Sequence, residues 1–304
     1  MIKNKLAIIL VNWNQYELTR SCILSILNCD YKNLKIIVVD NNSEDKSVDL
    51  LKSEFDCVNL IQNQSNLGFT GANNIGISMA KDLGFEFIML LNNDTEVENS
   101  FIEPLLERFK LENDLGAIQP LILNFYERDI VWNYGGKFNR FFGNPVTLYK
   151  NLRKDNLIKS KYTDWITGCC FVFRSRLIDQ IGYLDDDYFV YYEDADYSLK
   201  INNAGYKLGL EINSEIYHHE GESWRVKNSS SKTQSPYVHY LRFRNHLYFL
   251  KKNRNEFNLL GIILYQIFKF FSYSIYFILK LRFKKLSMVS KGLLDGLKLE
   301  KNAT

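Results

Sequence analysis

Hydrophobic runs and helical periodicity alternate along the first third of the chain. Four short runs rich in Ile, Val and Leu are typical of strands buried on both faces of a sheet; they are Leu6–Val11, Leu34–Val39, Val58–Ile61 and Phe87–Leu91. Between them, apolar spacing and capping residues predict helices over Glu17–Leu27, Ser43–Ser53 and Gly71–Asp82. This alternation predicts an α/β fold with a parallel sheet.

The second half of the chain is less regular. Apolar runs predict strands over Leu115–Leu123, Trp165–Phe173 and Lys207–Ile212, with strand and loop over Trp132–Phe138. We expect a short helix over Arg176–Ile181, an acidic segment leading into a helix over Tyr188–Tyr206, and an exposed linker over Lys227–Ser235.

Polar residues follow each of the first four predicted strands. These strand ends are Asn12-Trp13-Asn14, Asp40-Asn41-Asn42-Ser43, Asn63–Asn74 and Asn92-Asn93-Asp94. Ligands of parallel sheets bind beyond the carboxyl ends of the strands. One such end is an ordinary turn, but four at one edge predict a polar ligand with many hydrogen-bonding groups.

Composition narrows the class of protein. Hydrophobic residues make up 46% and charged residues 24% of the 304 positions, which is typical of a globular chain. The net charge of +3 is too small to indicate nucleic-acid binding. Five cysteines without a CxxC pair predict reduced thiols. The apolar run near the N-terminus is too short for a signal peptide, so we expect a cytoplasmic protein.

Three segments carry candidate chemistry. Asp94 ends a buried strand, where a carboxylate can hold a divalent cation, although a strand-end turn also accounts for it. Glu193 and Asp194 precede a helix and could supply a general base, with Asp194 preferred; carboxylates also simply favour a helix start. His218 and His219 would face opposite ways in a strand, so at most one could join a metal site.

The order of these segments resembles the family 2 glycosyltransferases of the GT-A fold, especially their bacterial rhamnosyltransferase-like branch. The matching segments are ILVNWNQ, IIVVDNNSEDKS, NQSNLGFTGANNIGI, FIMLLNNDTEV, WITGCCFVFRS, GYLDDDYFVYYEDADYSLKINNAGYKLG and IYHHEGES. The resemblance implies a GT-A domain at 1–225, with a nucleotide-sugar half near 1–120 and an acceptor half near 121–225. It leaves a helical extension at 226–304.

The resemblance implies a donor pocket at the polar strand ends. Asp40 matches the carboxylate that contacts the nucleobase, and it could accept the imide N–H of uracil or thymine. The other donor-side positions are Asn12, Asn14, Asn42, Asn66, Gly68, Asn73, Asn92 and Asn93. A UDP- or dTDP-sugar donor follows, with dTDP-rhamnose among the candidates.

The family's Asp-x-Asp metal motif reads Asn92-Asn93-Asp94 here, so the first acid is missing. By resemblance Asp94 binds Mn²⁺ or Mg²⁺, and His218 is the downstream ligand. Asp194 matches the catalytic base, with Glu193 as second choice, and a single displacement implies inversion at the anomeric carbon.

Two further positions, Trp165 and Gly168, match the acceptor side in the family, and Trp165 could stack on a sugar ring.

The run Leu259–Leu279 is nearly all apolar and long enough to span a bilayer. Its polar residues form one narrow stripe; they are Gln266, Lys269, Tyr273, Tyr276 and Lys280. Basic residues flank both ends, so the charge asymmetry of a spanning helix is absent. We expect a helix in the membrane interface, ahead of a spanning helix and of packing on the catalytic domain or a second chain.

An interfacial helix would suit a lipid-linked glycan acceptor in surface polysaccharide or O-antigen assembly, at the inner face of the plasma membrane. There are two alternatives to a glycosyltransferase besides an oxidoreductase. A nucleotidyltransferase lacks support because no Gly-rich phosphate loop with a basic residue lies near the N-terminus. A non-catalytic sugar-nucleotide-binding scaffold is left open by the weakened metal motif. The absence of GxGxxG after the first strand argues against a dinucleotide oxidoreductase.

Overall fold

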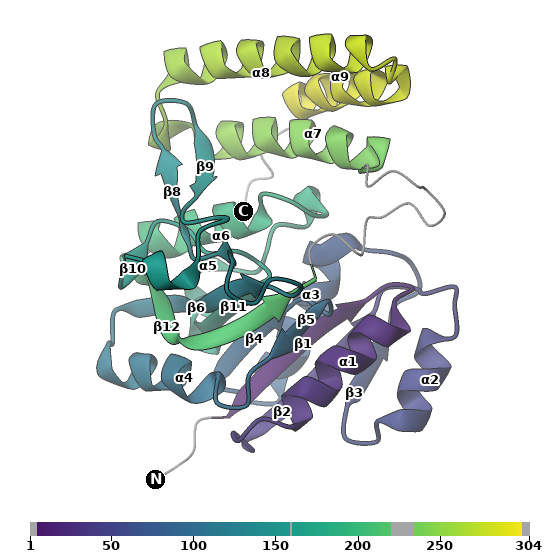
Figure 1. Ribbon diagram of the computed structural model, residues 1–304, viewed down its shortest axis with the longest axis vertical. Coiled ribbons are helices and arrows are strands. Elements are labelled where there is room, and N and C mark those ends of the chain that lie inside the picture. Colours follow the sequence, from purple (N-terminus) through teal and green to yellow (C-terminus); the bar gives the residue numbers. More distant parts are fainter. Residues whose placement is uncertain (1–4, 159, 220–233, 300–304) are drawn as a thin grey trace. The chain divides into compact units, whose positions relative to one another are not determined.

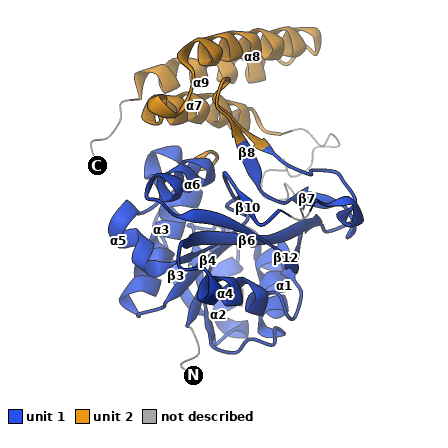
Figure 2. Ribbon diagram, turned by 90° about the vertical axis from the view of Figure 1, so that its left-hand side faces the viewer, with its two compact units in different colours: residues 1–137, 147–189, 193–223 blue, residues 138–146, 190–192, 224–304 orange. Residues whose placement is uncertain are grey.

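The computed structural model describes residues 5–158, 160–219 and 234–299. The chain forms two compact units, drawn in blue and orange in Figure 2. Unit 1 comprises residues 1–137, 147–189 and 193–223, and unit 2 comprises residues 138–146, 190–192 and 224–304. Unit 2 therefore includes two short pieces from earlier in the chain, which a division at residue 225 does not anticipate.

Unit 1 is an α/β unit, with helices flanking a sheet (Figure 1). Its strands are β1 Leu6–Asn12, β2 Leu34–Asp40, β3 Asn59–Gln62, β4 Phe87–Leu91, β5 Thr95–Val97, β6 Leu115–Asn124, β7 Val131–Asn133, β10 Tyr162–Thr163, β11 Cys170–Arg174 and β12 Lys207–His218. Its helices are α1 Tyr16–Leu27, α2 Ser47–Glu54, α3 Gly68–Asp82, α4 Ile102–Leu111, α5 Ile178–Ile181 and α6 Glu193–Asn203.

The described strands of unit 1 form one mixed sheet in the order β10-β12-β6-β11-β4-β1-β2-β3. Strands β3, β2, β1 and β4 pair in parallel, as the alternation of strand and helix predicts. Strand β11 runs antiparallel between β4 and β6, and β5 and β7 pair at the side with β12 and β6. The α/β class is confirmed, and the sheet is mixed because β11 is antiparallel to both of its neighbours, although β6 and β12 again pair in parallel.

Both faces of the sheet are buried. In β1, Leu6, Ile8 and Leu10 pack into a core with apolar residues of α1, α2 and α4. Ala7 and Ile9 point the other way, into a core with α3, α5 and α6. Because every second side chain meets a different helix layer, β1 and β4 have no polar face, and polar residues appear only where these two strands end.

Several expected boundaries move in the structure. The helix predicted from Ser43 begins at Ser47, because the N–H and hydroxyl of Ser43 both donate to Asp40 instead. Strand β12 continues past Ile212 through an irregularity between Glu211 and Glu215. The strand predicted from Trp165 begins only at Cys170. Most of the predicted linker 227–235 lies outside the described residues.

Among the residues that the structure describes, unit 2 contains a short hairpin and three α-helices. Its elements are β8 Gly136–Asn139, whose first two residues belong to unit 1, β9 Asn144–Thr147, α7 Pro236–Lys252, α8 Leu259–Leu279 and α9 Phe283–Lys298. The predicted apolar helix is found with the expected bounds. By length and composition α8 could cross a membrane, and it is the one such helix among the described residues.

Part of the polar stripe of α8 lies inside unit 2, whereas Lys280, predicted at its end, is exposed. Gln266 and Lys269 lie 3.0 Å from a ring nitrogen of His246 on α7, and Tyr273 packs edge-on against Phe243. Tyr276, predicted to belong to the stripe, is half-exposed. The stripe thus serves to pack α8 on α7, which leaves the apolar side of α8 exposed.

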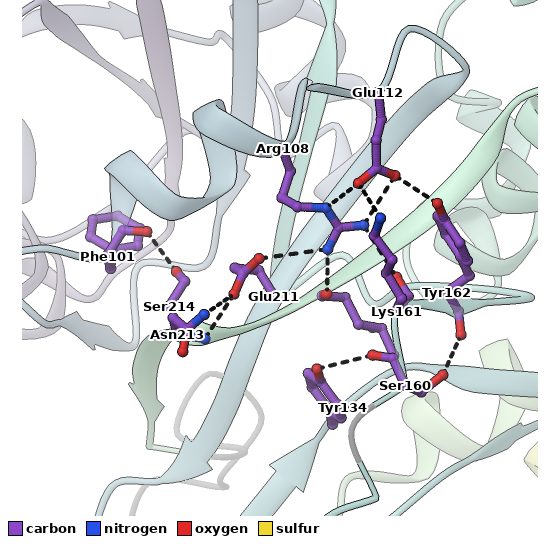
Figure 3. Close-up of polar contacts among 11 residues, drawn as sticks. Phe101, Arg108, Glu112, Tyr134, Ser160, Lys161, Tyr162, Glu211, Asn213 and Ser214 are labelled. Atoms are coloured by element: carbon purple, nitrogen blue, oxygen red, sulfur yellow. Dashed lines mark hydrogen bonds and ion pairs between the residues drawn. The ribbon is translucent and has the colours of Figure 1, made fainter. Parts of the chain in front are cut away.

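In unit 1, a polar cluster joins α4 to β12 and to the segment before β10 (Figure 3). Nε of Arg108 lies 2.6 Å from Oε1 of Glu112, and its Nη1 lies 3.5 Å from Glu211 of β12. Lys161 and the hydroxyl of Tyr162 contact the same Glu112 carboxylate at 2.9 and 2.8 Å. Burial alone would raise the pKa of Glu112, but hydrogen bonds from Arg108, Lys161 and Tyr162 lower it to about 2.

Replacing Arg108 by Met should destabilise unit 1 by about 3 kcal/mol, because Glu112 and Glu211 lose the guanidinium that they share in a nearly buried site. Since the pKa of Glu112 is lowered by folding, its stabilising contribution is present above pH ~4.3 and is lost as the pH falls towards 2. Urea unfolding measures both effects. Lys110→Met, which breaks an exposed pair with Glu107, is the control; an equal loss in both variants would contradict the role of the cluster.

Candidate functional site

A chain of buried side-chain hydrogen bonds joins the ends of three parallel strands. Nδ2 of Asn12, at the end of β1, donates to Asp40 at the end of β2 (2.7 Å). Oδ1 of Asn12 accepts from the hydroxyl of Thr19 on α1 (2.7 Å), and Nδ2 of Asn93 beyond β4 donates to the same hydroxyl (2.8 Å). Asp40, Asn12, Thr19 and Asn93 are all buried, so this chain fixes the strand ends relative to one another.

The loop after β2 is organised by the same carboxylate. Asp40 is fully buried and accepts from the N–H and the hydroxyl of Ser43 as well as from Asn12. Asn14 and Asn42 both have left-handed backbones, with φ of 55° and 61°. Asn42 is exposed, and Oδ1 of Asn14 accepts from the N–H of Glu44 (2.7 Å). Direct contact of Asp40 with a base stays a prediction.

A second amide cluster shapes the turn before α3. Nδ2 of Asn41 donates to Oδ1 of Asn66 (2.9 Å) and to the carbonyl of Gly68 (3.0 Å). Oδ1 of Asn66 also accepts from the N–H of Gly68, and Nδ2 of the buried Asn73 donates to the carbonyl of Phe69. Asn66 and Gly68 therefore meet in this turn, and Asn73 lies one helical turn further along α3. Their contact with a donor stays a prediction.

Gly68 occupies a position that no larger residue can take. Its φ is +72°, and a Cβ there would lie 2.5 Å from both the ring and the carbonyl of Phe189. That carbonyl accepts from the N–H groups of Phe69 and Thr70, at the start of α3. The close approach ties the turn before α3 to the segment that leads to Asp194.

Asp94 and His218 form the candidate metal pair. Both are buried, and Nε2 of His218 lies 3.1 Å from Oδ1 of Asp94. Burial alone would raise the pKa of Asp94, but the charge and proximity of His218 outweigh it and leave the pKa lowered. His219 faces elsewhere and stacks on Phe125 with ring centroids 3.6 Å apart, so only His218 of the two lies against Asp94.

The donor set is compatible with a divalent cation. Neither ring nitrogen of His218 makes a hydrogen bond of ordinary geometry among the described residues, although the ring is buried. A buried imidazole without a hydrogen bond of ordinary geometry, next to a carboxylate, is a donor pair that suits a divalent cation. Within residues 5–158, 160–219 and 234–299, no group of three or more His, Cys, Asp and Glu could hold a metal. Two protein ligands plus diphosphate oxygens suffice for Mg²⁺ or Mn²⁺.

Asp194 lies in the first turn of α6 and is held by backbone donors. Oδ2 accepts from the N–H of Gly168 (3.1 Å), and Oδ1 accepts from the N–H of Ala195 (2.7 Å). Burial raises the pKa of Asp194, and these hydrogen bonds oppose the rise without cancelling it. Glu193, the second choice, is almost fully buried. A fixed carboxylate with a raised pKa has the properties of a general base.

The sheet register brings the two carboxylate sites together. Cys170 of β11 pairs with Leu91 of β4, and the N–H of Asn92 donates to the carbonyl of Cys169 (2.9 Å). Asn92 and Gly168 thus lie at the same end of neighbouring strands. The segment that holds Asp194 runs directly beside the segment that carries Asp94.

On the acceptor side, the two predicted residues have different surroundings. A Cβ on Gly168 would come within 3.3 Å of the ring of Phe69, so Gly168 allows a close contact with α3. The ring of Trp165 packs on Gly136 and is only 7% exposed. A sugar-stacking role for Trp165 stays a prediction, and this burial leaves little of its ring surface accessible.

Three residues of the site were missed by reasoning from sequence. Thr19 bridges Asn12 and Asn93, but nothing in the sequence of α1 distinguishes it. Asn41 and Ser43 lie in a segment that was recognised as polar, and each makes several of the hydrogen bonds that shape it. The candidate residues from Asn12 to Asp194 otherwise gather at the carboxyl edge of the parallel strands.

Cysteine chemistry has no part in this site. All five cysteines are free. Burial raises the pKa of Cys22 to about 12 and raises that of Cys169 well above its ordinary value, so both remain protonated thiols.

Known proteins resemble this chain in sequence and in fold. The chain is 27% identical over 259 residues to the low-salt glycan biosynthesis hexosyltransferase Agl10 of Haloferax volcanii, covering 79% of this chain and 73% of that protein. It is 26% identical over 210 residues to an N-acetylglucosaminyl-diphospho-decaprenol L-rhamnosyltransferase of Mycobacterium tuberculosis, covering 62% and 68%.

A solved structure shares the fold at lower identity. The crystal structure of GalNAc-T7 with UDP, GalNAc and Mn²⁺ matches with a TM-score of 0.62 and 17% identity, over 82% of this chain. The chain spans about half of that longer protein, 48% of its length. The family model described as "Glycosyl transferase family 2" matches residues 7–191. The chain belongs to glycosyltransferase family 2.

Proposed function

We propose that this protein is an inverting, metal-assisted glycosyltransferase that moves a sugar from a UDP- or dTDP-sugar to a hydroxyl of a glycan or lipid-linked glycan. The observation that carries this proposal is the Asp194 carboxylate. It is fixed by two backbone N–H donors and its pKa is raised by burial. One of these donors, Gly168, lies on the segment that runs beside the one that carries Asp94.

The reaction needs one proton acceptor and one leaving group. Asp194 takes the proton of the acceptor hydroxyl, and the oxygen forms a bond to the anomeric carbon of the donor sugar. The bond from that carbon to the diphosphate breaks on the opposite side, and the nucleoside diphosphate leaves with the bonding electrons. Attack opposite the leaving group inverts the anomeric configuration.

Asp94 and His218 would hold the divalent cation, with the amide oxygen of Asn92 as a neutral addition. A bound Mn²⁺ or Mg²⁺ offsets the charge that develops on the leaving diphosphate. The net charge of unit 1 supports the need for a cation at this site. Of the chain's 38 Lys and Arg and 35 Asp and Glu, unit 2 holds 17 and three, so unit 1 carries a net charge of −11. An anionic donor approaches such a unit more readily beside a cation.

The names of relatives support the substrate class. The Mycobacterium tuberculosis relative is named as an L-rhamnosyltransferase acting on an N-acetylglucosaminyl-diphospho-decaprenol, and the Haloferax volcanii relative as a hexosyltransferase of glycan biosynthesis. We therefore propose dTDP-rhamnose as the first donor to test, and a polyprenyl-diphosphate-linked sugar as the first acceptor.

Unit 2 supports a membrane-bound acceptor. The exposed side chains of α8 are large and apolar; they include Leu260, Ile263, Leu264, Ile267, Phe268, Phe271 and Ile275. Unit 2 carries 17 basic against three acidic residues, a charge that complements an anionic lipid surface. Because one side of α8 packs on α7, we propose that α8 lies in the membrane interface rather than spanning the bilayer.

Asp194→Asn should lower kcat by about 10²- to 10⁴-fold and leave donor binding unchanged, because an amide cannot accept the proton. In the wild-type enzyme kcat should fall as the pH drops through the raised pKa of Asp194, with a midpoint above that of an ordinary aspartate carboxyl. Release of nucleoside diphosphate from UDP-, dTDP- and GDP-sugars, with a short-chain polyprenyl-diphosphate acceptor, measures both effects.

Asp179→Asn, which makes the same charge change on the exposed side of α5, is the matched control for the base. Turnover of Asp194→Asn within a fewfold of the control would contradict the base role. A protein that binds no sugar nucleotide with or without metal would contradict the transferase itself and favour the scaffold.

Asp94→Ala and His218→Ala should each weaken Mn²⁺ binding in the presence of UDP by at least about tenfold, since even outer-sphere partners contribute that much. Asn92→Asp, which restores a second carboxylate, should strengthen it. Electron paramagnetic resonance of free Mn²⁺ measures the affinity without reference to activity. Asp114→Ala, at an exposed pair with Lys207, is the control, and equal affinities in all four variants would refute the site.

The double variant Phe268→Asp, Phe271→Asp should lose most of its sedimentation with vesicles that contain phosphatidylglycerol, because it places two charges in the apolar face. Leu111→Asp, at an even more exposed apolar position of unit 1, should bind as the wild type does. Wild-type protein should also be released from membranes by alkaline carbonate. Retention after carbonate would instead support a spanning helix.

A further inference from the structure

Three residues of unit 2 lie in the chain immediately before the proposed base. The chain leaves unit 1 after Phe189, packs with unit 2 over residues 190–192, and returns to unit 1 at Glu193. Its two flanks are fixed in unit 1: the carbonyl of Phe189 accepts from the start of α3, and Asp194 accepts from Gly168 and Ala195. Contacts that hold residues 190–192 in place therefore also influence the position of Asp194.

The backbone of this segment is strained. Phe189, Tyr191 and Tyr192 have φ of 64°, 74° and 74°. Bulky residues rarely adopt this left-handed region, and a bend with two of them in succession persists only where surrounding contacts hold it. No glycine relieves the bend at these positions.

The contacts that hold the bend come from α7. Nδ2 of the fully buried Asn245 donates to the carbonyl of Val190 (2.7 Å) and to the carbonyl of Tyr191 (2.9 Å). Its Oδ1 accepts from Nε of Arg244 (2.8 Å), which fixes the orientation of the amide. One side chain thus uses both of its N–H donors on two successive carbonyls of the strained segment.

The next residue of α7 supports the same segment. The ring of His246 stacks on that of Tyr192, with centroids 4.9 Å apart and an interplanar angle of 11°. Nε2 of His246 lies 2.9 Å from the carbonyl of Gly143, so it carries the proton, and Nδ1 accepts from Gln266 and Lys269 of α8. Every polar atom of this ring is engaged, so the plane that Tyr192 stacks on is fixed.

We propose that Asn245 and His246 are positioning residues for catalysis, which hold residues 190–192 in the bend that sets the start of α6 and so the placement of Asp194. Unit 2 then helps to position the proposed base, in addition to its proposed contact with the membrane. This inference rests on the proposed function, because it takes Asp194 as the base.

Asn245→Leu and Asn245→Asp in the full-length protein test the proposal. Both variants remove the two N–H donors. Asn245→Asp keeps the side-chain volume and the oxygen that accepts from Arg244, so it can be used if Asn245→Leu does not fold. Tyr240→Phe is the matched control, since it removes a hydrogen bond from α7 to Asp295 of α9 and keeps both Asn245 donors to residues 190–192. Amide hydrogen exchange over residues 189–196 and the kinetics of transfer are measured on all three.

We expect faster exchange over residues 189–196 in both Asn245 variants and not in Tyr240→Phe. We also expect kcat to fall about 10- to 100-fold with an unchanged KM for the donor, because a misplaced base slows chemistry and not binding. A role in stability alone would lower the melting temperature without this split.

Unchanged exchange in the Asn245 variants, or faster exchange with an unchanged kcat, would overturn the inference. A wild-type protein that transfers no sugar would instead overturn the proposed function and, with it, the catalytic part of the inference. The exchange data would still show whether Asn245 holds the segment, so the two failures can be told apart.

Discussion

The hydrogen-bonded chain Asp40–Asn12–Thr19–Asn93 is the constraint on which the site depends. These groups are buried, and an unpaired carboxylate or amide there would cost more than the hydrogen bonds contribute. The ends of β1, β2 and β4 must therefore stay in one arrangement for all of them to be satisfied. The polar edge of the sheet is rigid before any ligand binds, which is a condition for catalysis by preorganised groups.

Two strand pairings extend this rigid edge to the candidate chemistry. The antiparallel strand β11 places Gly168 beside the end of β4, and Gly168 donates to Asp194. Strand β12 pairs with β5, so that His218 lies opposite Thr95 and next to Asp94. The proposed base and the proposed metal ligands come from distant parts of the chain, yet each is reached from β4 by backbone hydrogen bonds. A small shift of β4 would disturb both.

The two units divide the physical tasks but exchange short pieces of chain. Unit 1 carries the sheet edge and a net negative charge, whereas unit 2 carries the basic residues and the exposed apolar face of α8. The polar stripe of α8 and the buried His246 of α7 form one network, which continues to Tyr192 by stacking. Residues 190–192 belong to unit 2 by packing, and in the chain they precede α6, which carries the proposed base.

The sequence by itself determined the α/β class, the buried strands, the apolar helix Leu259–Leu279 and the family, because these follow from local periodicity and ordered motifs. It also predicted most of the polar residues that lie at this edge, since the carboxyl ends of parallel strands share one side of a sheet. Only the tertiary structure decided that the Asp40 carboxylate accepts hydrogen bonds from Ser43 and Asn12. It alone also decided that Thr19 joins two strand ends and that the polar stripe of α8 faces α7. Each of these depends on a partner far away in the chain, and the partner of a hydrogen bond leaves no periodic signal in sequence.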